Sequence, residues 1–152
     1  PVLDLMGRDF FHCGPLGMGE AMKLTNNFLA ATLMAASVEA LVTGAKAGLS
    51  LDLMMDVMRT TMAWNNQLAV SLPKKALAGD FSLGFMVKLA QKDQRLALGM
   101  AKALGSRTPV GQAAHDSLAE AAAAGLAELD VSALMKLREE QAGVVVRRKA
   151  GT

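Results

Sequence analysis

Apolar residues recur at helical spacing along most of the chain, and this pattern predicts a helical protein. The clearest case is the segment 20–47, where one face carries Leu24, Phe28, Ala31, Ala35, Val38 and Val42. Its other faces are also apolar, and no glycine interrupts it before Gly44. We therefore expect one helix about 40 Å long that is apolar nearly all round and buried on most sides.

Shorter helical patterns follow, separated by turn signals. Ser50 is suited to cap a helix that reaches about residue 61, and Pro73 suits the first turn of a short helix. The remaining helices are expected over 64–72, 85–104, 109–124 and from Asp130 or Ser132 to 142. No run after Gly19 alternates as a strand would, so the predicted fold class is all-α: a helical bundle around one long buried helix.

The two ends of the chain differ from this helical part. Residues 9–13 form a short aromatic run that is typical of a strand, and the cluster 14–19 is rich in glycine. We divide the chain into segment 1–13, a hinge at 14–19, a helical domain at 20–143 and a tail at 144–152. The basic residues Arg147, Arg148 and Lys149 are interpreted as part of a frayed, solvated tail.

Composition narrows the class of protein further. Hydrophobic residues make up 52% of the chain, with 5 Phe and 1 Trp against 11 Met, so Ala, Leu, Met and Val must fill the core. A net charge of +2 does not favour nucleic acid as a partner. The apolar stretch 28–42 contains Glu39 and is shorter than the roughly 20 residues of a membrane span, and no signal peptide is visible. With a single cysteine, the expectation is a soluble cytoplasmic protein without a membrane partner.

Lys23 and Asn27 are the first candidates for chemistry. They lie four residues apart near the start of the long helix, so they share a face. A lysine at a helix start is disfavoured as a cation, and burial there would tune it for acid–base work, with the amide orienting a substrate oxygen. A solvated lysine beside a capping asparagine is the alternative. His12 and His115 lack further ligands at metal-binding spacing, so no metal site is expected.

A second candidate lies on the helix 85–104. Its basic residues form one stripe, which a solvated face would also explain: Lys88, Lys92, Arg95 and Lys102. Asp93 differs from them, because it shares a face with Leu89, Leu96 and Ala97. We therefore expect Asp93 to lie at a packing boundary and to need a partner.

These segments resemble the β-hydroxyacid dehydrogenase family. Residues 14–27 match its hinge motif, Gly-x-x-Gly-x-Gly-x-x-x-Lys-x-x-Asn-Asn, at every fixed position, and residues 85–93 are similar to its Phe-x-x-x-Leu-x-x-Lys-Asp segment. The resemblance implies that Lys23 is the catalytic acid/base, that Asn27 binds substrate and that Lys92 contacts the dinucleotide. It also implies a fold like the C-terminal domain of 6-phosphogluconate dehydrogenase, and a homo-oligomer, most simply a dimer.

Two related groups match less well. The 6-phosphogluconate dehydrogenases usually place His where this chain has Asn26, and imine reductases usually replace the lysine. One departure from the family is Gln94, which stands where Leu is usual. The glycine cluster 14–19 lacks the third spaced glycine of a dinucleotide loop, so we do not interpret it as one.

The resemblance further implies a larger enzyme. Family members begin with a Rossmann domain that binds NAD or NADP, and residues 1–13 are similar to the end of that domain. We therefore expect a hydride exchange between NAD(P) and a small hydroxy acid in the complete protein, and no turnover by this chain alone. The competing hypothesis is a non-catalytic helical dimerisation module, which would place no constraint on positions 23, 27 and 92.

Overall fold

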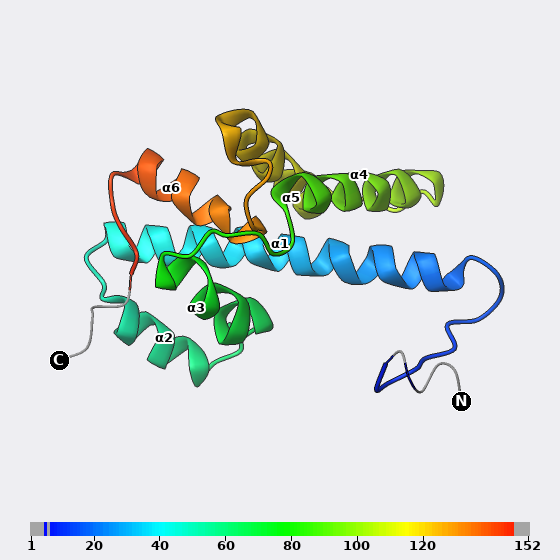
Figure 1. The fold of residues 1–152 in the computed structure, drawn as a ribbon, viewed down its shortest axis with the longest axis horizontal. Coiled ribbons are helices and arrows are strands. Elements are labelled where there is room, and N and C mark those ends of the chain that lie inside the picture. The colour runs from blue at the N-terminus through cyan, green and yellow to red at the C-terminus, as the bar shows by residue number, and fades with distance from the viewer. Residues whose placement is uncertain (1–4, 6, 148–152) are drawn as a thin grey trace.

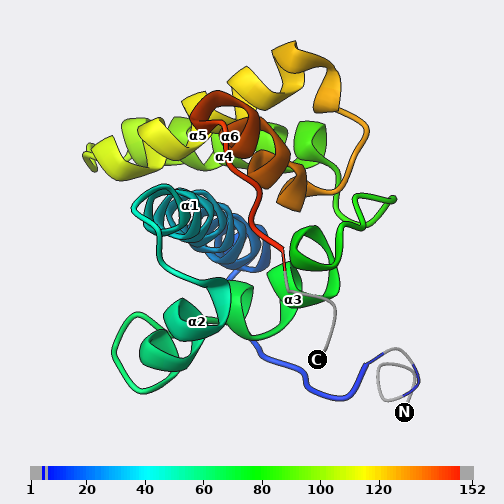
Figure 2. The same cartoon turned by 90° about the vertical axis from the view of Figure 1, so that its left-hand side faces the viewer.

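The long helix α1 (Met18–Lys46) forms the axis of the molecule, as the computed structural model in Figure 1 shows. The structure describes residue 5 and residues 7–147. On one side of α1 lie α4 (Val87–Ala103), α5 (Pro109–Ala121) and α6 (Leu134–Ala142), and on the other lie α2 (Leu51–Arg59) and α3 (Leu72–Lys74). Figure 2, which looks along α1, shows the same three layers. The described residues contain no strand, so the all-helical prediction is confirmed for them.

Several helix ends form where the sequence predicts them. The Ser50 hydroxyl accepts a hydrogen bond from the Leu53 amide at 3.3 Å and caps α2. Asp130 caps a 3₁₀ turn (Val131–Ala133) that leads into α6, through a 3.0 Å bond from the Ser132 amide. The structure adds two π-helical turns, Gln67–Ser71 before α3 and Ala122–Leu126 after α5, and a 3₁₀ turn at Ala76–Ala78.

The core lies between α1 and the helices on both of its sides. Most of its large, fully buried side chains are aliphatic or thioether groups, as the composition predicts; among them are Met34, Val38, Leu41, Leu72, Leu118, Leu134 and Met135. Gln94 is also fully buried, and its amide nitrogen donates to the Thr32 hydroxyl at 3.1 Å and to the Gly111 carbonyl at 3.2 Å. The departure from the family pattern at this position therefore joins α1, α4 and α5 by hydrogen bonds.

The burial of α1 differs from the expectation. Helices cover α1 from two sides, but a strip along it stays exposed and carries Met18, Met22, Leu29, Ala36 and Ala40. The expectation of burial on most sides is therefore wrong for a single chain, because the layers above and below α1 do not meet around it (Figure 2). By length and composition alone α1 could cross a membrane, a test that the core helix of a soluble protein also passes.

The two ends of the described chain also correct the sequence interpretation. Residues 9–13 form no strand, because they lie outside the helical bundle without a neighbouring strand to pair with (Figures 1 and 2). At the other end Val146 is only 2% exposed, and its amide donates to the Glu139 carboxylate at 2.6 Å. Arg147 pairs with the same carboxylate and lies over the Phe81 ring. The solvated tail is therefore wrong for residues 144–147, while Arg148 and Lys149 lie outside the described residues.

Candidate active site

Three predicted site residues converge on a single carboxylate, that of Asp93. The ammonium nitrogens of Lys23 and Lys92 lie 3.0 Å and 2.8 Å from Oδ1 of Asp93. The side-chain amide of Asn27 donates to Oδ2 at 2.7 Å. The structure thus brings α1 and α4 together through Lys23, Asn27, Lys92 and Asp93, which we name the Asp93 cluster.

The two helices explain this geometry. Lys23 and Asn27 are one turn apart on α1, so both side chains face α4. Asp93 projects inward from α4 with 5% of its side chain exposed, whereas Lys23 and Lys92 are 43% and 47% exposed. The sequence pattern predicts that Asp93 needs a partner, and the structure gives it three: Lys23, Asn27 and Lys92. The burial of Lys23 that would tune a lysine for catalysis is absent in this structure.

The electrostatics of the cluster follow from these contacts. Burial opposes ionisation of Asp93, but hydrogen bonds from Lys92, Asn27 and Lys23 outweigh it and lower the pKa of Asp93 below its ordinary value. The ionised carboxylate pairs with two lysine side chains, each of which is about half exposed. The buried carboxylate thus holds the N–H groups of Lys23, Lys92 and Asn27 near the surface. Such donors suit an oxygen atom of an incoming molecule.

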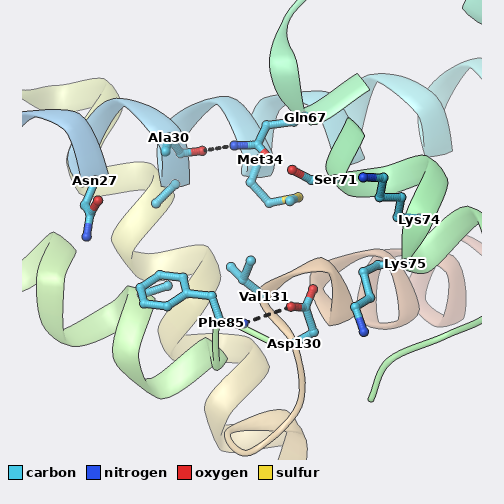
Figure 3. Close-up of a pocket in the computed structure, with 12 residues that line it drawn as sticks. Asn27, Ala30, Met34, Gln67, Ser71, Lys74, Lys75, Phe85, Asp130 and Val131 are labelled. Carbon is cyan, nitrogen blue, oxygen red and sulfur yellow. Dashed lines mark hydrogen bonds between the residues drawn. The ribbon is translucent and has the colours of Figure 1, made fainter. Parts of the chain in front are cut away.

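A cavity of about 470 Å³ begins at Asn27 and runs between α1 and the segment that contains α3. Figure 3 shows its side chains: Asn27, Ala30, Met34, Gln67, Ser71, Lys74, Lys75, Phe85, Asp130 and Val131. Most of its surface is apolar, and its size is that of a small-molecule site. Because Asn27 belongs to both, the cavity and the Asp93 cluster form one candidate site.

The sequence analysis missed the far wall of this cavity. Gln67, Ser71 and Lys74 come from an irregular stretch, a π-helical turn that continues into α3. A regular helical period does not describe a π turn, so the shared face of these residues was not visible in the pattern. The signal that remained was the spacing of Ser71 and Lys74 around Pro73, since residues three apart on a helix are neighbours.

The histidines lie apart from this site. His12 is exposed, and Nδ1 of His115 lies 3.3 Å from the exposed carboxylate of Asp116 on α5. Among the described residues, no group of three or more His, Cys, Asp or Glu side chains is arranged to hold a metal ion.

Comparison with known proteins assigns the family. Residues 17–138 match the family model described as "NAD-binding of NADP-dependent 3-hydroxyisobutyrate dehydrogenase". The chain belongs to this family. The family's cofactors are NAD and NADP, and its members are oxidoreductases, which confirms that part of the sequence prediction.

Individual relatives agree with the family model. The chain is 36% identical to 3-sulfolactaldehyde reductase from Escherichia coli, over 98% of this chain and 50% of that protein. It is 35% identical to 2-(hydroxymethyl)glutarate dehydrogenase from Eubacterium barkeri, over 96% of this chain and 48% of that protein. The structure of Mycobacterium tuberculosis 3-hydroxyisobutyrate dehydrogenase with L-serine superimposes with a TM-score of 0.81 at 34% identity, over 90% of this chain and 49% of that one. The chain thus spans about half the length of each of these three relatives.

Proposed function

We propose that this chain is the helical C-terminal part of an NAD- or NADP-dependent dehydrogenase that acts on a small hydroxy acid, with Lys23 as its acid/base. The observation that carries the proposal is the Asp93 cluster: Lys23, Asn27 and Lys92, the positions that the family motifs single out, meet at one carboxylate beside a cavity. A dimerisation module alone would have no reason to gather these three side chains. The domain fold proposed is that of the 6-phosphogluconate dehydrogenase C-terminal domain.

The residues of the chain have distinct tasks in this proposal. As a neutral amine, Lys23 takes the proton of the substrate hydroxyl when the alcohol is oxidised; as the resulting ammonium, it returns the proton to the carbonyl oxygen in the reverse direction. Asn27 donates to a substrate oxygen, and Asp93 positions both through the bonds described above. We propose that Lys92 contacts the dinucleotide, and the half-exposed Lys92 side chain beside Lys23 supports this role. The cofactor supplies the hydride acceptor or donor.

The described residues could contact part of that cofactor, but they offer no binding loop for its pyrophosphate. The Asp93 cluster offers cationic and amide donors, which suit polar groups of a substrate and a dinucleotide. The glycine cluster 14–19 leads directly into α1 without the strand that precedes a phosphate-binding loop. We therefore propose that the pyrophosphate is bound by a Rossmann domain outside this chain, that residues 1–13 belong to its end, and that the chain alone has no turnover.

A homo-oligomer is part of the same proposal. Besides the exposed strip of α1, other helices carry exposed apolar side chains, among them Leu53 and Val57 of α2, each 53% exposed. Exposed apolar surface of this extent favours association, and the simplest closed assembly is a dimer. Light scattering should give twice the mass of the chain; a monomer at all concentrations would contradict this. A cytoplasmic location is likewise proposed, to be tested by cell fractionation.

The decisive experiment is a turnover screen of a protein that joins this chain to its nucleotide-binding domain. NADH or NADPH formation is followed with 3-hydroxyisobutyrate and other small β-hydroxy acids, and cofactor oxidation with the matching aldehydes. We expect turnover with at least one of these compounds, and none with the 152-residue chain alone. If the joined protein binds NAD(P) but turns over none of them, the proposed function is wrong.

A further inference from the structure

The cavity beside Asn27 has a polar end that the reaction proposed above does not use. Asn27 lies at the mouth nearest Lys23, and the walls beyond it are apolar: Ala30, Ala31 and Met34 from α1, facing Phe85 and Val131. At the opposite end the wall carries Gln67, Ser71 and Lys74 (Figure 3). A molecule that reacts at Lys23 and extends along the cavity would therefore end at these three side chains.

Lys74 is the uncompensated charge at this end. Within the part of the chain that the structure describes, Lys74 is exposed and takes part in no ion pair and no hydrogen bond. Its neighbour Lys75 differs, because the Lys75 ammonium lies 2.9 Å from the Asp80 carboxylate and also donates to Ser82. Figure 3 shows the Lys74 side chain directed towards Ser71, at the end of the cavity where Met34 lies. Of the two lysines that line the cavity, Lys74 is therefore the one without an ion pair among the described residues. The Asp130 carboxylate also lines the cavity, but it accepts from the backbone amides of Phe85 and Ser132.

The Ser71 hydroxyl adds a donor for an anion beside Lys74. The Ser71 hydroxyl has no hydrogen-bond partner among the described residues, and it lies one turn before Lys74. Gln67 is held in place, because its amide nitrogen donates to the Ala30 carbonyl at 3.1 Å. A cation and a hydroxyl on one wall are the groups that recognise a carboxylate or a similar acidic group.

The length of the cavity limits what can reach both ends. Asn27 and Met34 are seven residues apart on α1, which corresponds to about 10 Å along the helix. Lys74 lies on the wall at the Met34 end, with its side chain directed towards Ser71 (Figure 3). A substrate held at Asn27, one helical turn from Lys23, therefore needs a tail of several bonds to bring a second group to Lys74, since a chain covers roughly 1.2 Å per bond. A methyl group in that position would leave Lys74 without a partner.

We propose that Lys74, with Ser71, binds a second acidic group of the substrate, so that the preferred substrate is a hydroxy acid with an anionic tail and not a simple monoacid. This inference rests on the proposed function, because it takes Lys23 as the reacting end. Lys74 acts here as a specificity residue. It touches the substrate far from the carbon that reacts.

A matched pair of substrates tests the proposal in the protein that contains the nucleotide-binding domain. 3-Hydroxyisobutyrate and 2-(hydroxymethyl)glutarate share the hydroxymethyl carbon and the first carboxylate, and differ by a methyl group against a carboxyethyl tail. Lys74→Gln should lower kcat/KM for the diacid by about tenfold or more, the effect of one lost charged hydrogen bond, and for the monoacid by less than twofold. Lys74→Arg should restore most of the diacid value.

Lys102→Gln is the control for loss of one positive charge, since Lys102 is exposed on α4 and lines no part of this cavity. It should leave the ratio of the two kcat/KM values unchanged. If Lys74→Gln also leaves that ratio unchanged, or lowers both values equally, the proposal is wrong while the proposed function stands.

An equilibrium measurement separates this proposal from the proposed function. Glutarate and butyrate are titrated into the 152-residue chain, and the amide signals of Gln67, Ser71 and Lys74 are followed by NMR. Glutarate should shift these signals with an affinity at least fivefold above that of butyrate, and Lys74→Gln should remove the difference. Equal affinities for both acids in the unchanged chain would overturn the proposal even if no hydroxy acid were turned over.

Discussion

Asp93 and Asp130 are two buried aspartates with opposite kinds of partner. Asp93 is 3% exposed and Asp130 is 7% exposed, so both carboxylates need hydrogen bonds. Asp130 receives them from backbone amides, that of Phe85 at 3.1 Å and that of Ser132 at 3.0 Å. Asp93 receives them from the side chains of Lys23, Asn27 and Lys92.

This difference separates a structural carboxylate from one that serves a site. Backbone amides cannot leave Asp130 without unfolding the loop before α4 or the turn before α6, so the carboxylate fixes those two segments together. The Lys23 and Lys92 side chains are about half exposed, so each can exchange Asp93 for a ligand while α1 and α4 remain in place. Glu139 resembles Asp130 in this respect, since it accepts from the Val146 amide and fixes the end of the chain.

Replacement of Lys23 tests the first half of the comparison and should have the largest effect. In the protein joined to its nucleotide-binding domain, Lys23→Ala should lower kcat by about 100-fold or more, the usual contribution of a general acid or base. The free energy of unfolding should change by less than about 1 kcal/mol, because Lys23 is half exposed and Asp93 keeps two other donors. Steady-state kinetics and urea unfolding measure the two quantities.

The matched control is Lys88→Ala, which removes a lysine on the same face of α4 as Lys92. Lys88 pairs with the exposed Glu128 carboxylate at 2.7 Å and does not touch Asp93. Its replacement should leave kcat within about twofold. A Lys23 variant whose kcat is as little affected as that of the control would remove Lys23 from the acid/base role.

Replacement of Asp130 tests the second half. Asp130→Ala leaves two backbone amides without their acceptor and removes the cap before α6, so it should lower the free energy of unfolding by about 2 kcal/mol. Urea unfolding followed by circular dichroism measures this. Asp52→Ala is the control, since Asp52 is exposed in the first turn of α2 and should cost under about 1 kcal/mol. Equal losses in the two variants would show that Asp130 fixes nothing.

The contrast also explains what the sequence could predict. Lys23, Asn27, Lys92 and Asp93 lie on regular helices, so their faces follow from a period of 3.6 residues, and the family motifs name them. The helices of the bundle were predictable for the same reason, and the Ser50 and Asp130 caps from their residue types. Neither the helical period nor the family motifs predict which side chains of two helices contact one another. The convergence of Lys23 and Lys92 on one carboxylate depends on how α1 and α4 pack.

The errors arise where tertiary contacts override local pattern. The segment 144–147 has the composition of a tail, yet buried Glu139 binds it. The aromatic run 9–13 has the composition of a strand, yet no strand lies beside it. Ser71 and Lys74 face the cavity because a π turn resets the helical register before α3, and nothing in the apolar spacing of the sequence marks that turn.

Removal of the charge of Asp93 should have a smaller effect on stability than removal of Asp130. Asp93→Asn keeps the shape of the side chain and part of its hydrogen bonding, so the loss of unfolding free energy should be about 1 kcal/mol at pH 7. The effect on the site should be larger than that on the fold, because Lys23 and Asn27 lose their anionic partner. Expressed as an activation free energy, the loss of kcat should exceed the loss of unfolding free energy. A variant with unchanged kcat would show that Asp93 does not position Lys23.

The acid dependence of this difference is the smallest effect and the most specific to Asp93. Hydrogen bonds from Lys92, Asn27 and Lys23 lower the pKa of Asp93 from its ordinary value of 3.8, so the folded protein holds the carboxylate ionised more strongly than the unfolded chain does. The stabilisation is complete above the unfolded value and is lost as the pH falls through the lower, folded value. The difference in unfolding free energy between the unchanged chain and Asp93→Asn should therefore be constant from pH 7 to about pH 5 and shrink below about pH 4.

Urea unfolding of both proteins at pH 7, 5, 4 and 3 measures this difference. The subtraction cancels the contribution of the other carboxylates, which titrate in both proteins. A difference that stays constant down to pH 3 would mean that the charge of Asp93 contributes nothing to joining α1 and α4.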